Sequence, residues 1–128
     1  MHKHKSCILV LLIVAACSSE PAWLLVEKGP PQETHVALEK EGGLVRARLR
    51  SVAEKTPGKP PTYTSYTVML VNCEDKSVRM VSHEVIDDAL GATIVKHAMP
   101  DVFNRPSNWD AALPKRFCDH VMEGRPWA

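Results

Sequence analysis

The sequence predicts a single α+β domain: an antiparallel β-sheet of about six strands, with one helix near the C-terminal end packed on a face of the sheet. Three observations lead to this prediction. Apolar and polar residues alternate along most of the chain, short turns separate the alternating runs, and a helical pattern occurs only close to the end. Alternation with period two is typical of strands that are buried on one side.

The first three strands are predicted at 22–28, 34–40 and 44–52. The first of these runs is "AWLLVEK", and the second and third are joined by "EGG", whose glycines allow the positive φ of a tight turn. In the third run, apolar residues occupy every second position and arginines occupy positions between them. This pattern predicts a half-buried antiparallel strand.

The stretch 53–62, "AEKTPGKPPT", is predicted to be a loop or an excursion of the sheet edge, because proline cannot continue a central strand. The runs 64–73 and 77–86 flank "EDK" and form the strongest predicted hairpin. A last short strand is expected at 92–97, after a turn around Gly91.

The C-terminal part changes character. The segment 98–114 has three prolines and no period, so we expect it to wrap the sheet as coil. The segment 114–122 allows one short helix, and Pro114 suits its first turn. Phe117 and Val121 would then face the sheet, as Cys118 could.

Residues 1–16 are predicted to be a secretory signal peptide. Lys3 and Lys5 precede an apolar run of ten residues, 7–16, which ends in small residues. This run is about half of the roughly 20 residues that a membrane-spanning helix needs. We therefore do not expect it to remain in the protein as a membrane span.

The end of that run, "VAAC", resembles a bacterial lipobox, an aliphatic residue and two small residues before cysteine. The resemblance implies that Cys17 carries a lipid, that the chain is cut before it, and that 17–22 tether the domain to a membrane. Otherwise Cys17 is only a small residue near an ordinary cleavage site. Ser18 differs from the aspartate of an inner-membrane retention signal, which favours the outer membrane and leaves open whether the domain faces outward or the periplasm.

The mature chain is expected to hold one domain, 23–122, and a short C-terminal tail, 123–128. Without Lys3 and Lys5, 14 of the 16 basic side chains remain, against 15 acidic ones. Because the charges nearly cancel, the composition predicts no nucleic-acid partner.

Cys73 and Cys118 are the cysteines left after the signal peptide and the lipidated Cys17. An exported chain with two such cysteines most simply forms one disulfide. The bond would fasten the C-terminal helix to a hairpin corner. A redox or metal role would require a CxxC pair or clustered ligands, which the sequence lacks.

The order of these features resembles the surface-adhesin protein E family. The residues that carry the resemblance are Cys17, Trp23, Gly42, Gly43, Val45, Leu49, Ser65, Asn72, Cys73, Arg79, Trp109 and Cys118. The resemblance implies a six-stranded antiparallel sheet with a helix on one face, in an outer-membrane lipoprotein. Members of the family bind host extracellular-matrix and serum proteins such as laminin and vitronectin.

Two groups of residues are candidates for binding. Arg46, Arg48 and Arg50 share one side of a predicted strand and could hold carboxylates, sulfates or phosphates. The alternative, which we favour, is that they pair with acids across the hairpin, such as Glu39 and Glu41.

Tyr63 and Tyr66 are the second group. They lie in the proline-rich loop 55–66, which could be a recognition edge. The alternative, which we favour, is that it is only a spacer between strands.

No enzyme, cofactor or metal site is expected. The histidines His35, His83, His97 and His120 have no chelating spacing, and alternation places His83 and Glu84 on opposite faces. The sequence therefore predicts an envelope lipoprotein that binds a protein or polysaccharide without catalysis. The alternative is a structural or envelope-maintenance protein that faces the periplasm.

Overall fold

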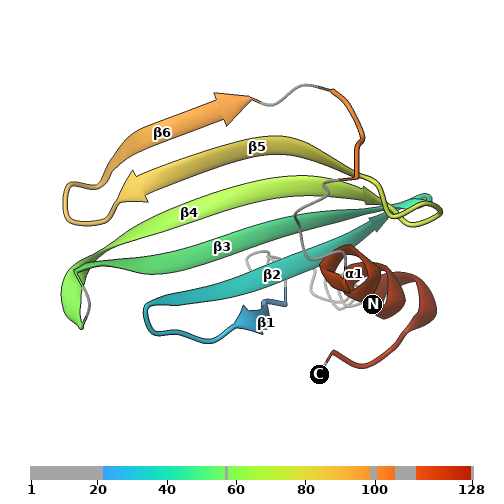
Figure 1. Ribbon diagram of the computed structural model, residues 1–128, viewed down its shortest axis with the longest axis horizontal. Helices are drawn as coiled ribbons and strands as arrows, with labels where there is room; N and C mark the ends of the chain where they lie inside the picture. Colours follow the sequence, from blue (N-terminus) through green and yellow to red (C-terminus); the bar gives the residue numbers. More distant parts are fainter. Residues whose placement is uncertain (1–21, 57, 99–100, 106–111, 128) are drawn as a thin grey trace, which may run out of the picture.

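The computed structural model describes residues 22–56, 58–98, 101–105 and 112–127, which form one sheet and one helix (Figure 1). The elements are β1 (Leu24–Glu27), β2 (Gln32–Glu41), β3 (Leu44–Thr56), β4 (Lys59–Asn72), β5 (Val78–Asp87), β6 (Ala92–Ala98) and α1 (Ala112–Glu123). Each strand pairs antiparallel with its neighbours in the chain, in the order β1-β2-β3-β4-β5-β6. The predicted α+β fold is confirmed.

Short turns explain why the strands follow one another in order. Gly42, between β2 and β3, has φ +63°, and Gly91, between β5 and β6, has φ +65°. Other residues adopt this conformation only at a cost in energy, so glycine suits both reversals. Consecutive strands joined in this way pair with each other and not with distant partners.

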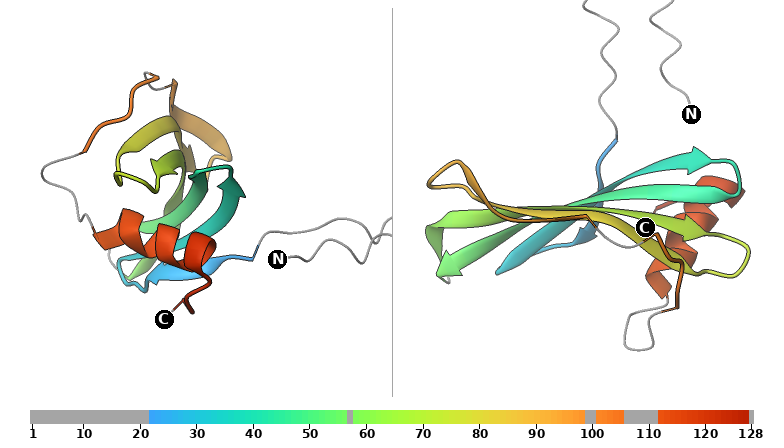
Figure 2. Two further views of the ribbon diagram at one scale, coloured as in Figure 1. Left: turned by 90° about the vertical axis from the view of Figure 1, so that its right-hand side faces the viewer. Right: turned by 90° about the horizontal axis from the view of Figure 1, so that it is seen from above.

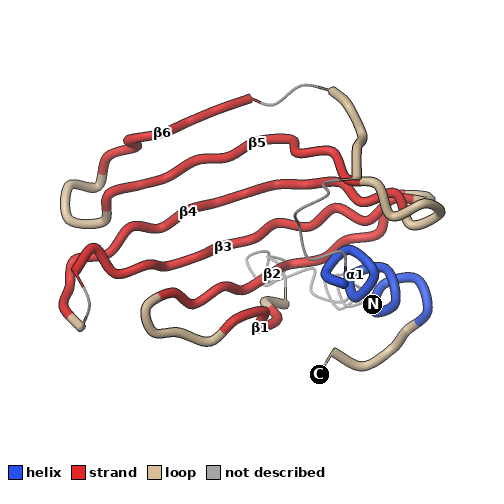
Figure 3. Tube along the Cα trace, viewed as in Figure 1, coloured by secondary structure: helices blue, strands red, loops and turns tan. Residues whose placement is uncertain are grey.

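Of the two alternatives predicted for 53–62, a loop or an excursion of the sheet edge, the loop is wrong. β3 continues to Thr56 and β4 begins at Lys59, so most of the proline-rich stretch is strand, as the red tube in Figure 3 shows. The pairing of β3 with β4 is irregular between Glu54 and Thr56, and β5 pairs with β4 only from Tyr63 onward. Prolines are tolerated where the ladder is irregular or one side has no neighbouring strand.

The sheet has two different faces. Its helix face bears α1 and contains Val36 of β2, Val45 and Ala47 of β3, and Met69 and Val71 of β4. We call the opposite face the arginine face, because Arg46, Arg48 and Arg50 of β3 lie there. The two side views in Figure 2 show α1 against one side of the twisted sheet.

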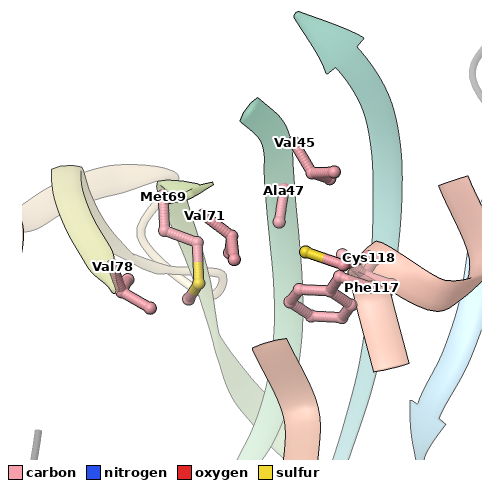
Figure 4. Close-up of a cluster of buried hydrophobic side chains, with 8 residues drawn as sticks. Val45, Ala47, Met69, Val71, Val78, Phe117 and Cys118 are labelled. Atoms are coloured by element: carbon pink, nitrogen blue, oxygen red, sulfur yellow. The ribbon is translucent and has the colours of Figure 1, made fainter. Parts of the chain in front are cut away.

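The hydrophobic core lies between α1 and one end of the helix face. Phe117 of α1 is fully buried, and Cys118 is 4% exposed. Figure 4 shows both side chains pointing from the helix toward Ala47 and Val45 of β3. Val121 packs against the same cluster, which confirms the predicted inner side of the helix.

The disulfide between Cys73 and Cys118 is present, with an S–S distance of 2.11 Å and a Cα–Cα distance of 5.7 Å. Cys73 follows β4 at the β4–β5 turn, so the bond joins α1 to a hairpin corner as predicted. The pairing makes a covalent cross-link between the sheet and the helix.

Two segments near the C-terminus add to this end of the molecule. Asn104, from the predicted coil, exchanges both backbone hydrogen bonds with Val78 of β5, at 2.8 and 2.9 Å. In the predicted tail, Trp127 stacks on Phe117 with ring centroids 6.0 Å apart. Its indole N–H donates to the Leu25 carbonyl over 2.7 Å, so the tail reaches β1.

The one helix in the part of the chain that the structure describes, α1, is not long and apolar enough to cross a membrane.

Candidate functional site

The helix covers only part of the helix face, and a groove occupies the rest. In Figure 1, α1 lies over the end of the sheet where the β2–β3 and β4–β5 turns are, and the opposite end is uncovered. The groove there has a volume of about 330 Å³. The side chains that line it are Gln32, Ser51, Ala53, Tyr63, Ser65, His83, Val85 and Ile94. Small-molecule sites usually span about 300–1,000 Å³, so the groove lies at the lower end of that range.

Strand alternation explains how these residues meet. Ser51 pairs with Ser65, and Ala53 with Tyr63, at positions of β3 and β4 that point to the same side as Val45 and Ala47. The helix face therefore changes along the strands, from large apolar residues under α1 to small and polar residues in the groove.

A hydrogen-bonded row separates the core from the groove. The buried Thr34 shares a hydrogen bond of 2.7 Å with the Ser51 hydroxyl and accepts one of 3.3 Å from the Gln32 amide. Farther across the sheet, Thr67 Oγ1 and His83 Nδ1 are 3.0 Å apart. These contacts hold the polar side chains in place, so the lining is preorganised.

An ion pair borders the groove beside Tyr63. Lys55 Nζ lies 2.5 Å from Asp87 Oδ2 and 4.8 Å from the centroid of the Tyr63 ring. The hydrogen bond from Lys55 lowers the pKa of the Asp87 carboxyl, and backbone N–H groups of Leu90 and Ala89 lower it further. The same hydrogen bond raises the pKa of Lys55. Both groups are charged near neutral pH, so this border carries a neutralised pair.

This ion pair predicts a loss of stability in acid. Because the Asp87 pKa is lower in the folded than in the unfolded chain, where it is about 3.9, the pair stabilises the fold at higher pH. The contribution disappears as pH falls through the folded-state pKa. We expect Asp87→Asn to flatten the decrease in unfolding free energy below about pH 4, measured by urea titration at several pH values.

Lys55→Met is the matched test, since it removes the other partner. The double variant should differ little from either single variant if the pair acts as one unit. Additive effects of the two substitutions would contradict the pairing.

The three predicted arginines share the arginine face, but their surroundings differ. Arg46 forms an ion pair with Glu41, which raises the pKa of Arg46 and lowers that of Glu41. Arg50 lies with its guanidinium carbon 4.4 Å from the centre of the Trp23 ring. Arg48 is exposed. The pairing with acids that we favoured thus holds for Arg46.

Tyr63 and Tyr66 do not form one recognition edge, so that alternative is wrong for the pair. Both lie within β4, and because they are three positions apart they point to opposite faces. Tyr63 lines the groove, whereas Tyr66 is 40% exposed on the arginine face, opposite Arg50. The structure therefore separates the candidate binding residues between two surfaces.

His83 and Glu84 lie on opposite faces, since His83 pairs with Thr67 and Glu84 with Tyr66. Within the described residues, no three side chains of His, Cys, Asp or Glu are grouped so that they could hold a metal ion. Cys17, the predicted lipidation site, and Trp109 lie outside the described residues.

The sequence analysis missed most of the groove. It did not group Ser51, Ser65 and His83 as one site, although the sequence contains a signal for part of this group. Ser51 and Ser65 continue the inward parity of the apolar positions in their strands, so polar residues stand where the alternation predicts buried ones. In β5 a register shift changes the parity, so His83 faces inward although the core residue Met80 is three positions away.

Searches of protein-family models, of curated proteins and of solved structures found no match to this chain. The resemblance to the surface-adhesin protein E family therefore stays a prediction from the residues quoted above.

Proposed function

We propose that this chain is a lipid-anchored protein of the bacterial envelope whose domain binds a ligand without catalysis, and that the groove is the ligand-contacting surface. The observation that carries the proposal is the uncovered end of the helix face, where five strands line one hollow with apolar side chains, such as Val85 and Ile94, and a few polar ones, such as Ser65. An apolar lining with a few fixed polar groups is the usual composition of a binding site.

The contacts within the groove favour binding. The Ser51 hydroxyl is bonded to Thr34, and His83 Nδ1 is bonded to Thr67, so both side chains are held in position. The Tyr63 ring and Val85 add apolar area that a ligand can cover. Together they provide hydrogen-bonding groups and a contact surface.

The location rests on two supports. The first is the N-terminal pattern, in which Lys3, Lys5 and an apolar run precede Cys17. The second is the Cys73–Cys118 disulfide, because such bonds persist in exported proteins and are rare in reducing compartments.

Protease treatment of intact cells tests the location and the direction that the domain faces. We expect intact-mass analysis of the membrane fraction to find acyl chains on Cys17. Loss of the protein on intact cells indicates surface exposure, and protection until lysis indicates the periplasm. Recovery of an unlipidated protein from the soluble fraction contradicts the anchoring.

A variant that fills the groove tests the ligand site. Following the family resemblance, we expect the purified domain to bind immobilised laminin or vitronectin. Ser65→Trp should weaken this binding about tenfold or more, because the indole occupies the hollow. The matched control is Val68→Trp, which places the same side chain on the arginine face of the same strand.

Equal binding by the wild type, Ser65→Trp and Val68→Trp contradicts the groove as the contact surface. Retained thermal unfolding midpoints in both variants show that the comparison concerns binding and not folding.

The uncharged lining favours a second candidate ligand, a glycan strand of the envelope. None of the eight lining residues is an Asp, Glu, Lys or Arg. Hydroxyl, amide and imidazole groups beside an aromatic ring suit a neutral sugar chain. Cosedimentation with peptidoglycan that is weakened by Ser65→Trp, without binding to laminin or vitronectin, supports the periplasmic role.

A further inference from the structure

We propose that the arginine face docks on the surface of the membrane that holds the anchor, with Arg48 and Arg50 contacting the phosphates of anionic lipids. The proposal rests on the proposed function in one respect, the lipid on Cys17. It adds an interaction surface and an orientation of the domain, neither of which follows from the presence of an anchor.

The position at which the described chain begins is the first argument. Trp23 lies beneath the Arg50 guanidinium, and it precedes Leu24, which pairs with Val36 on the helix face. Trp23 therefore belongs to the arginine face. Figure 2 (right) shows the blue start of the described chain leaving the sheet on the side opposite to α1.

The length of the preceding chain is the second argument. Cys17 is six residues before Trp23, and six residues reach at most about 20 Å when fully extended. A lipid on Cys17 would hold the membrane surface within that distance of Trp23. The arginine face is therefore the face that the tether brings nearest to the lipid headgroups.

The chemistry of the arginine face is the third argument. Leu25 of β1, Val52 of β3 and Tyr66 of β4 are 41%, 38% and 40% exposed, and they lie on the same face as Arg50. Tyrosine is enriched at membrane interfaces, where its ring is apolar and its hydroxyl remains hydrated. Arginine binds phosphate oxygens in a planar, two-point geometry. Exposed apolar and cationic side chains on one face thus suit an anionic lipid surface.

The acids of the arginine face limit the strength of this contact. Glu41 is neutralised by Arg46. The other acids that register places on this face are Glu33, Glu39, Glu54 and Glu84, of which Glu33 and Glu39 are exposed. Arg48 forms no ion pair with another described residue, so its charge is available to a phosphate. With few free cations, the domain should dock only when the anchor raises its local concentration at the membrane.

The orientation has a consequence for the groove. Because the groove lies on the helix face, docking through the arginine face directs the groove away from the membrane. A ligand can then reach Tyr63 and His83 from the aqueous side.

Nitroxide labels on two adjacent residues test the orientation in the lipidated protein. Val52→Cys reports on the arginine face and Ala53→Cys on the groove, and both lie in β3. The protein is reconstituted in vesicles of phosphatidylethanolamine and phosphatidylglycerol, and a water-soluble nickel complex measures label accessibility. We expect the label at Val52 to be shielded and the label at Ala53 to remain accessible.

Equal accessibility at both positions overturns the proposal, since the domain would then hang freely from its tether. Shielding at Ala53 instead of Val52 also overturns it, because the groove would then face the lipid.

Charge reversal tests the role of the arginines. Arg48→Glu should lower the ratio of docked to undocked protein about fivefold or more, because basic side chains are attracted to anionic lipids. Lys115→Glu on α1 is the matched control and should leave the label at Val52 shielded. If the label at Val52 is shielded equally in Arg48→Glu and in the protein with Arg48, the proposed contact with phosphate is overturned.

Intact-mass analysis of the same preparation distinguishes failure of the lipid anchoring from failure of the membrane docking. Absence of acyl chains on Cys17 overturns both the anchoring and the docking. A lipidated protein without shielding at Val52 overturns the docking alone.

Discussion

Removal of the Cys73–Cys118 disulfide is expected to lower the free energy of unfolding by about 4 kcal/mol, the entropy cost of closing a loop across 45 residues of unfolded chain. Domains of this size are stable by only about 5–15 kcal/mol, so the loss is a large share of the total. The bond is the covalent link between the sheet and α1.

Urea denaturation of Cys73→Ala/Cys118→Ala checks this expectation. The denaturant midpoint should fall, and the slope m should rise because the unfolded chain without the cross-link exposes more surface. Wild-type protein treated with a reductant should match the double variant. A decrease in the free energy of unfolding of less than about 1 kcal/mol would mean that packing alone holds α1 on the sheet.

The fold was largely predictable because short-range patterns determine it. The alternation in 44–52 specifies which side of that strand is buried, and Gly42 and Gly91 specify where the chain reverses. When every connection is a short turn, the order of the strands in the sheet is the order in the sequence.

The proline-rich stretch could not be predicted in the same way. Pro61 indicates a loop when only its neighbours in sequence are considered. Whether a strand tolerates it depends on which strands lie on either side, and β5 begins to pair with β4 only at Tyr63. That information comes from tertiary structure and is absent from a local pattern.

The candidate site was predicted less well than the fold, for a related reason. Tyr63 and Tyr66 were grouped as one candidate because they are close in sequence, but strand geometry places them on opposite faces. Ser51 and His83 are far apart in sequence and line one groove. The groove exists because α1 is only 12 residues long and covers one end of a longer sheet, which no single motif reveals.

The two faces of the sheet differ, so each could contact a different partner. On the helix face, α1 buries the apolar end and leaves the end with Ser51 and Ser65 open. On the opposite face, Arg46 and Arg50 have partners within the domain, namely Glu41 and Trp23. Arg48, between them in β3, is the arginine that remains exposed.

Phe117→Ala is expected to lower the free energy of unfolding by about 3–5 kcal/mol, the second of the two largest effects. The ring is fully buried between α1 and the sheet, and it also stacks on Trp127. Truncation to alanine leaves a cavity that the disulfide at Cys118 prevents from closing, since the bond fixes the distance of the helix from the hairpin corner. The measurement is the unfolding free energy from urea denaturation.

Phe103→Ala is the matched control, because the same atoms are removed from a ring that is 37% exposed. We expect a cost of about 0.5 kcal/mol there. Since the groove lies at the other end of the sheet, Phe117→Ala should retain the ligand binding of the wild type at temperatures where it is folded. Similar costs for the two substitutions would contradict the position of Phe117 in the core. Loss of binding in folded Phe117→Ala would show that α1 contributes to the ligand site, although the groove lies at the end of the sheet that α1 does not cover.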